Sequence, residues 1–252
     1  MKLGKIKLLD EKIKKYEGLD PIFRIDNSEF KRIEYPYIIT FVNTFSYYQL
    51  LDSKCSVDKI DYIFVDGYLQ VILHNLFHKN KINRVSFDFS SIADDFFNYI
   101  IKNNLKIALI GAREDEVSFA VSNLKSKYKD LQIPYFRNGY FSNKTERDDL
   151  CNELEAQNID VVILGMGTPV QEEFAIYLKE NDVCSHIFTC GGFITQTAKN
   201  IDYYKNIVKK GNLRWLQRAI EYPHIRKRLI INYPINIIRY LFERIILCFI
   251  KK

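Results

Sequence analysis

A carboxylate stands directly after a β-branched run in the first third of the chain. The run IDYIFVDG ends in Asp66 and Gly67. In a parallel sheet the carboxyl end of a strand faces the ligand crevice, and an aspartate there can serve as a general base. Asp-Gly pairs also form ordinary turns and helix N-caps, so this motif alone leaves both roles open.

The segment VVILGMGTPVQEEF is the richest of the predicted strand ends. Gly165 and Gly167 allow a ligand to approach the backbone closely. Pro169 suits the first position of a helix, which puts Gln171 and Glu172 in the first turn. We expect an open loop here, with free N–H donors above the sheet.

Helix capping gives another explanation for part of this segment. Thr168 and Gln171 have the spacing of a capping box, which would account for Gln171 without any ligand. It does not account for the two glycines before the cap. Gly191 and Gly192 follow the last apolar run in the same way, and Gly111 follows an earlier one. Such loops at neighbouring strand ends predict a site for a phosphorylated or sugar-nucleotide ligand.

The charged residues favour phosphate binding without a metal ion or another cofactor. Arg84 could pair with a phosphate bidentately, or it could be a surface arginine. The chain has no D-x-D triplet, the carboxylate pair with which many nucleotide-sugar transferases hold Mg²⁺ or Mn²⁺. His74 and His78 have the spacing of a zinc pair, but HNLFH lacks the Glu of HExxH, so core or surface histidines are favoured. The fingerprint of a nicotinamide-dependent enzyme is also missing.

Short β-branched runs alternate with helical patterns, which predicts an α/β fold with a mostly parallel, Rossmann-like sheet covered on both faces. We expect an N-terminal segment at 1–34, one catalytic domain at 35–205 and an appendage at 206–252. The expected helices lie near 46–54, 68–79, 91–103, 114–128, 145–157, 169–180 and 212–221. The expected strands are Tyr37–Val42, Asp61–Val65, Lys106–Ile110, Gln132–Phe136, Asp160–Leu164 and His186–Cys190.

Composition excludes several classes of protein. With 47% hydrophobic and 27% charged residues, the 252-residue chain can form a packed core. Its five cysteines form no CxxC pair, which argues against a disulfide framework and favours a reducing compartment. The net charge of +6 is concentrated in 221–252, where seven basic residues face two acidic ones. No nucleic-acid-reading motif accompanies this charge, so we expect no nucleic-acid partner.

The same tail is strongly apolar from Leu229 to Ile250. Its length approaches that of a membrane span, but Arg239, Glu243 and Arg244 interrupt it. The pattern favours a helix lying in the membrane interface. The alternatives are packing on the body or on a second copy in a homo-oligomer, and a true span. Because the N-terminus has no signal-peptide run, we expect a cytoplasmic protein, peripheral on the inner face of the plasma membrane.

Taken together, these segments resemble the WecG/TagA/CpsF glycosyltransferase family over roughly residues 38–228. The G-x-P-x-Q-E segment and the W-L-x-R…P…R block, in this order, are specific. The chain departs from the family pattern at Phe87 and after the double glycine, where it reads Phe193-Ile194-Thr195. The segments that carry the resemblance are Asn43, VDG at 65–67, Arg84 with Asp88, IGA at 110–112, NGYF at 138–141, LGMGTPVQEEF at 164–174, CGGF at 190–193 and LRWLQRAIEYPHIRKR at 213–228.

The resemblance implies an inverting hexosyltransferase. The family moves an N-acetylated aminosugar, usually N-acetylmannosamine, from a UDP-sugar to N-acetylglucosamine on a polyprenyl diphosphate at the cytoplasmic membrane face. The products enter teichoic acid, enterobacterial common antigen or capsule. A competing hypothesis is a non-catalytic nucleotide-binding α/β module of a membrane-bound polysaccharide assembly complex, in which Asp66 only caps a helix.

The resemblance also implies roles for single residues. Asp66 is then the general base, and Arg84 and Gln171 belong to the donor site. A further three arginines, Arg218, Arg226 and Arg228, would serve the lipid diphosphate or the membrane. The expected substrate-binding residues are Asn43, Thr44, Arg84, Gly111, Gly139, Tyr140, Gly165, Gly167, Gln171, Glu172, Gly191 and Gly192.

Overall fold

The computed structural model describes residues 3–23, 36–200 and 226–250. Within them a six-stranded sheet runs in the order β2-β1-β6-β5-β3-β4, and every neighbouring pair is parallel. The expected parallel sheet is therefore confirmed, and each expected strand is present to within one residue at either end. The strands are β1 (Tyr37–Val42), β2 (Tyr62–Val65), β3 (Lys106–Gly111), β4 (Gln132–Arg137), β5 (Val161–Gly165) and β6 (His186–Thr189).

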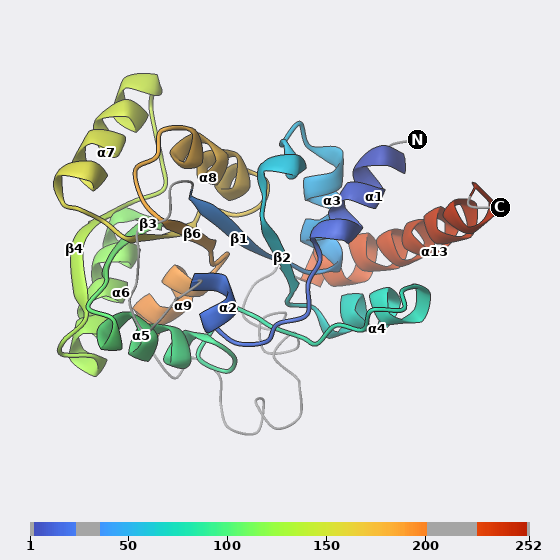
Figure 1. Ribbon diagram of the computed structural model, residues 1–252, viewed down its shortest axis with the longest axis horizontal. Coiled ribbons are helices and arrows are strands. Elements are labelled where there is room, and N and C mark those ends of the chain that lie inside the picture. The colour runs from blue at the N-terminus through green and yellow to red at the C-terminus, as the bar shows by residue number, and fades with distance from the viewer. Residues whose placement is uncertain (1–2, 24–35, 201–225, 251–252) are drawn as a thin grey trace.

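Helices cover both faces of this sheet (Figure 1). Side chains of consecutive strand residues enter two separate cores, as Ile38 and Ile39 do, because successive residues point to opposite faces. One core takes in α1 (Leu3–Lys12), α3 (Thr44–Asp52), α4 (Tyr68–Phe77), α7 (Lys144–Ala156), α8 (Val170–Glu180) and α13 (Tyr233–Ile250). The other takes in α2 (Asp20–Phe23), α5 (Ala93–Lys102), α6 (Glu114–Lys127) and α9 (Phe193–Lys199).

Single turns complete the described chain. η1 (Val57–Lys59) is a 3₁₀ turn before β2, and η2 (Arg228–Asn232) is a π-helical turn that leads into α13. The helix expected at 212–221 lies outside the described residues. All five cysteines are free, as the expected absence of a disulfide framework requires.

Helix α13 docks on the body through apolar side chains in the core and through buried charged side chains. The guanidinium of Arg244 is 3% exposed, and its Nη2 donates to Oδ1 of Asp10 in α1 at 2.8 Å. Glu243 is buried as well, and its Oε2 accepts from the hydroxyl of Tyr48 in α3 at 2.9 Å. The packing expected as an alternative for the tail is therefore present on one face of this helix.

The opposite side of α13 is apolar and exposed. Ile238 is 69% exposed, Phe242 61% and Phe249 74%. Because Tyr240 and Leu247 of the same helix are buried in the core, α13 carries apolar side chains on both its docked and its exposed side. Among the described helices, none has both the length and the apolar character that crossing a bilayer demands.

Candidate active site

A cavity of about 450 Å³ lies at the carboxyl ends of four adjacent strands, β2, β1, β6 and β5. Each strand contributes the residues that follow it: Asp66 after β2, Asn43 after β1, Gly191 after β6, and Gly167 with Gln171 after β5. This is the edge at which ligands bind in open α/β sheets. Five residues predicted from separate segments of the sequence are therefore brought together in one cavity.

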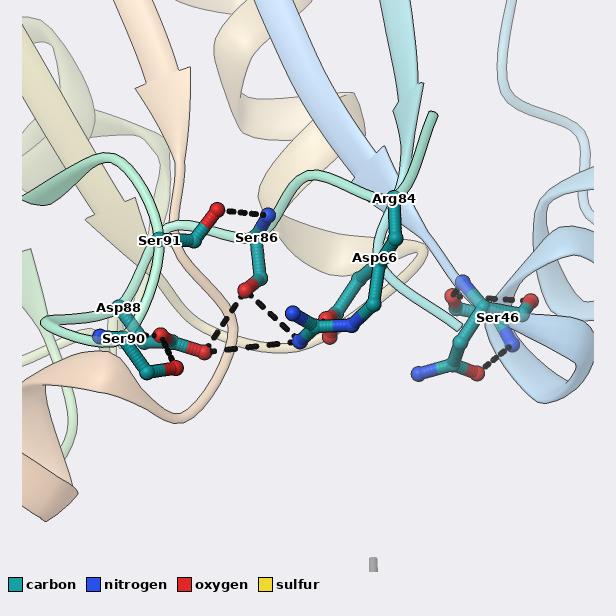
Figure 2. A network of polar contacts seen from close by, with 8 residues as sticks. Ser46, Asp66, Arg84, Ser86, Asp88, Ser90 and Ser91 are labelled. Atoms are coloured by element: carbon teal, nitrogen blue, oxygen red, sulfur yellow. Dashed lines mark hydrogen bonds and ion pairs between the residues drawn. The ribbon is translucent and has the colours of Figure 1, made fainter. Parts of the chain in front are cut away.

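Asp66 occupies the cavity wall as part of a network of polar contacts (Figure 2). Its Oδ1 accepts a hydrogen bond from Nη2 of Arg84 at 2.7 Å, and the same nitrogen donates to Oγ of Ser86 at 2.9 Å. Ser86 in turn donates to Oδ2 of Asp88 at 2.8 Å. Oδ2 of Asp66 forms no hydrogen bond to any described residue, and the side chain is 28% exposed. One carboxylate oxygen is thus oriented while the other can receive a proton.

Arg84 lies behind Asp66 and is not among the described residues that line the cavity. Its Nη2 also lies 3.8 Å from Oδ2 of Asp88, so the guanidinium sits between two carboxylates. A phosphate contact for Arg84 therefore stays a prediction, and the contact that the structure gives is with the candidate base. The side chain is partly exposed, at 22%, so the surface-arginine alternative stays open as well.

Asn43 caps α3 at the mouth of the cavity. Its Oδ1 accepts from the backbone N–H groups of Phe45 at 2.9 Å and Ser46 at 3.1 Å, and Oγ of Ser46 accepts from the N–H of Asn43 at 2.8 Å. This reciprocal arrangement is a capping box. It fixes the side chain, and Nδ2 of Asn43 donates to none of the described residues. Thr44, the next predicted residue, is buried and does not line the cavity.

The loop after β5 differs from its expected form. Helix α8 begins at Val170, so Pro169 is its N-cap and not its first helical residue as expected. The expected capping box of Thr168 and Gln171 is absent. Gln171 instead reaches back, and its Oε1 accepts from the N–H of Gly167 at 3.2 Å. The expectation of free N–H donors in this loop is therefore wrong for Gly167, because its N–H is hydrogen-bonded to Gln171. The hydrogen bond holds Gln171 against the glycine loop at the cavity edge.

Glu172 lies beneath the cavity instead of lining it. It is fully buried, and its Oε1 accepts from Thr40 Oγ1 at 2.7 Å and from Gln171 Nε2 at 2.9 Å. Its Oε2 has no partner among the described residues. Burial raises the pKa of this carboxyl, although the hydrogen bonds that it accepts act in the opposite direction. Glu172 thus supports Gln171 from beneath the cavity through these hydrogen bonds.

Three of the predicted glycines, Gly111, Gly139 and Gly165, allow neighbouring strands and loops to pack closely. A Cβ on Gly111, whose φ is +151°, would lie 2.4 Å from the carbonyl oxygen of Gly165 on the adjacent strand. A Cβ on Gly139 would lie 2.8 Å from the side chain of Met166. None of the three lines the cavity, and neither does the 68% exposed Tyr140. Their types are explained by close approach of neighbouring loops.

The tail supplies one side chain to the cavity. Arg228 lies among the lining residues, with its guanidinium carbon 4.4 Å from the ring centroid of Phe45. Arg226 is exposed and does not line the cavity, and Arg218 lies outside the described residues.

Sequence reasoning did not single out several residues of the cavity. Gln196 lies on α9, whose seven residues are too few for a clear helical period. Gln49 lies on α3, one turn after Ser46, so only its helical spacing could have indicated it. Sequence reasoning named Phe87, Asp88, Thr168 and Phe193 without assigning them to the site, and they too line the cavity. The described lining residues that it missed altogether are Phe41, Phe45, Ser46, Gln49, Ser86, Met166, Val170, Cys190 and Gln196.

Comparison with known proteins shows the family of this chain. The sequence model of the glycosyl transferase WecG/TagA/CpsF family matches residues 27–247, which span the whole sheet and most of α13. The chain belongs to this family. The expectation of an enzyme is confirmed at that level, because the family is one of glycosyltransferases.

Individual relatives have narrower names. The chain is 42% identical, over 214 residues, to a UDP-Gal:alpha-D-GlcNAc-diphosphoundecaprenol beta-1,4-galactosyltransferase of Shigella boydii, covering 85% of this chain and 90% of that protein. It is 23% identical over 185 residues to an N-acetylglucosaminyldiphosphoundecaprenol N-acetyl-beta-D-mannosaminyltransferase of Bacillus subtilis, covering 73% and 68%. A Staphylococcus aureus protein of that name is 25% identical over 186 residues, covering 73% and 69%.

Proposed function

We propose that this family member transfers a sugar, with inversion, from a UDP-sugar to N-acetylglucosamine carried on a polyprenyl diphosphate. The observation that carries the proposal is the position of Asp66. Its carboxylate lines a cavity shared with Asn43, Gln171 and the glycine loops, and one of its oxygens is not hydrogen-bonded to the described protein. A helix-capping role would not need this arrangement, and Asp66 forms no side-chain cap on α4.

We further propose that the donor sugar is galactose. What supports galactose is the 42% identity to the Shigella boydii galactosyltransferase, against 23% and 25% for the two mannosaminyltransferases. The sequence-based expectation of an N-acetylated aminosugar, usually N-acetylmannosamine, is the second candidate. Phe87 and Phe193 lie in the cavity wall at the positions where the chain departs from the family pattern, which also favours a different donor.

In the proposed step, the acceptor hydroxyl oxygen attacks the anomeric carbon of the donor sugar. Asp66 takes the hydroxyl proton as the new C–O bond forms, and the bond between the anomeric carbon and the diphosphate breaks, so UDP leaves with the electron pair. Arg84 holds the carboxylate toward the cavity through the 2.7 Å contact. General-base help of this kind contributes roughly 10²–10⁴-fold to the rate.

The leaving diphosphate requires fixed positive groups. Arg228 lines the cavity, and the N-terminus of the eleven-residue helix α8 opens onto it through Val170 and Gln171. We assign the diphosphate to this side of the cavity. These groups supply the positive charge without a metal ion, and we propose that none takes part in the step.

The acceptor is a lipid, so the enzyme must reach a membrane surface. We propose peripheral attachment at the inner face of the plasma membrane through the exposed side of α13. Ile238, Phe242 and Phe249 are each more than half exposed there, and they support this contact. Arg228 lies one short turn before α13 in the chain and lines the active-site cavity. A membrane-attached α13 would therefore hold the cavity close to the membrane surface.

A donor screen tests the proposal. The purified full chain is incubated with UDP-galactose, UDP-N-acetylmannosamine or UDP-N-acetylglucosamine and a short-chain lipid-diphosphate-N-acetylglucosamine, and product mass is measured. We expect a hexose to be added from UDP-galactose. Slow UDP release that is unaffected by acceptor, with no product from any donor, would instead favour the non-catalytic nucleotide-binding module.

A further inference from the structure

A second cavity, of about 810 Å³, lies between the C-terminal ends of α1 and α4. It shares no described lining residue with the candidate active site. Four exposed lysines surround it: Lys14 and Lys15 follow α1, and Lys79 and Lys81 follow α4. This charge distribution has no role in the transfer reaction.

The acidic residues of the lining do not neutralise these lysines. Asp10 already has a partner, because both of its carboxylate oxygens accept hydrogen bonds from the buried guanidinium of Arg244. Glu11 is the one other carboxylate among the described residues that line the cavity. Lys15 also pairs with the exposed Glu17 at 3.6 Å, which leaves Lys14, Lys79 and Lys81 as the main source of positive charge.

A metal ion is the other ligand that these residue types suggest. Asp10, His74 and His78 offer ligand atoms within 4.8 Å of one another. The imidazole rings stack in parallel with centroids 3.9 Å apart, so their in-plane lone pairs do not converge on one point. A guanidinium occupying both oxygens of Asp10 would also repel a divalent cation. The electrostatics therefore favour an anion over a cation.

Exposed apolar side chains occur on α4, which lines this cavity, and on α13, whose Arg244 holds Asp10. Arg244, which holds Asp10, is flanked along α13 by Phe242 and Ile245, which are 61% and 51% exposed. On α4, Leu76 is 68% exposed and stands two residues before His78 in the cavity wall. A ligand that joins a phosphate to acyl chains fits both features, because lysines attract anionic headgroups while exposed apolar side chains enter the acyl boundary.

We propose that this lysine-lined cavity binds the phosphate of an anionic phospholipid headgroup. The inference rests on the membrane contact of α13 in the proposed function and adds a partner for it. Bound in this way, the lipid would fix α1, α4 and α13 relative to the bilayer. Asp66, which lines the active-site cavity, directly precedes Gly67, the N-cap of α4. Fixing α4 would therefore give the active site a defined orientation to the lipid-linked acceptor.

Vesicle binding of the full chain tests the proposal. Co-sedimentation is measured with phosphatidylcholine vesicles, and with vesicles that also contain phosphatidylglycerol. We expect a marked increase with phosphatidylglycerol, and we expect the triple variant Lys14→Gln/Lys79→Gln/Lys81→Gln to lose it. At roughly fivefold per lysine, the full loss in partition coefficient is about 100-fold. A wild-type chain without the increase, or a triple variant that keeps it, would overturn the proposal.

The matched control removes the same charge elsewhere. Lys102, Lys125 and Lys129 are exposed and lie on or beside α5 and α6, at the other end of the sheet (Figure 1). Their triple glutamine variant should keep the phosphatidylglycerol-dependent binding. If both triple variants lose it equally, net charge explains the effect and the cavity does not.

A second measurement separates the headgroup from a free anion. Backbone amide shifts are followed while soluble dihexanoyl-phosphatidylglycerol or inorganic phosphate is added. We expect the phospholipid to shift the amides of residues 78–82 at lower concentration than phosphate does. Equal affinities would replace the lipid site by one for a soluble anion. Binding to neutral vesicles reports α13 separately, and transfer to a short-chain acceptor reports the proposed function, so each failure can be recognised.

Discussion

Replacing Asp66 by Asn tests the proposed base with little change in shape. The amide Oδ1 of the variant can still accept from Arg84, and Arg84 keeps its 2.9 Å bond to Ser86. Because the Asp66–Arg84 pair is partly exposed, at 28% and 22%, unfolding free energy should change by no more than about 1 kcal/mol. The turnover number should fall roughly 10²–10⁴-fold, since the amide cannot take the proton. This is about 2.7–5.5 kcal/mol in the barrier.

The assay is UDP release and product mass at saturating donor and acceptor, with thermal unfolding measured in parallel. Asp88→Asn is the matched control, because Asp88 lies in the same cavity and near the same arginine, but its oxygens accept from Ser86 and Ser90. Its turnover should fall by less than about tenfold. Near-wild-type turnover of Asp66→Asn, or an equal loss in both variants, would remove Asp66 from the role of base.

Four further predictions concern the supports of the site. Glu172→Gln should keep donor affinity, whereas Glu172→Ala should weaken it and cost about 1–3 kcal/mol of stability, because Thr40 and Gln171 lose their acceptor. Donor titration and thermal unfolding measure these effects, and equal behaviour of the two variants would contradict the prediction. Gly111→Ala should destabilise the fold by at least about 3 kcal/mol, because its Cβ would meet the Gly165 carbonyl at 2.4 Å, whereas Gly4→Ala, with open space around it, should unfold at or above the wild-type temperature. The pKa of Asp10 is lowered: burial alone would raise it, but hydrogen bonds from His78 and Arg244 outweigh burial. The charged carboxylate of Asp10 therefore stabilises the fold above the ordinary aspartate pKa, and this stabilisation is lost as the pH falls through the lowered pKa. The difference in unfolding free energy between wild type and Asp10→Asn should therefore shrink in acid. A difference that stays constant with pH would argue against the pairing. Transfer should continue in EDTA, and strict dependence on added Mg²⁺ or Mn²⁺ would contradict a metal-free step.

The sheet was predictable because buried parallel strands read as continuous apolar runs. All five residues of β5, VVILG, are buried and none is polar, so this strand shows no alternation with polar positions. The parallel arrangement then puts the residues after each strand at one edge, which is why Asp66, Gln171 and Gly191 could be placed in one site. Helix α9 was missed because its seven residues follow the double glycine directly.

Partners of charged side chains were less predictable, because they depend on tertiary contacts. Arg84 was expected at a phosphate, and the chain gives no local sign that it would lie 2.7 Å from Asp66. The charges of the tail are a second case. Arg239 and Arg244 were weighed as obstacles to membrane insertion, but both pair with carboxylates of the body, Asp52 and Asp10. The sequence contains these residues without showing which way the helix is turned.

The charged contacts on the docked side of α13 and the apolar side chains on its exposed side respond in opposite ways to salt. Ions weaken the attraction between Arg239 and the half-exposed Asp52, whereas sulfate and similar salts strengthen apolar association on the side of Phe242 and Phe249. Acid removes the carboxylate partners and leaves the hydrocarbon side chains untouched. Ionic conditions therefore act in opposite directions on the charged contacts that hold this helix to the body and on the apolar side chains that it exposes.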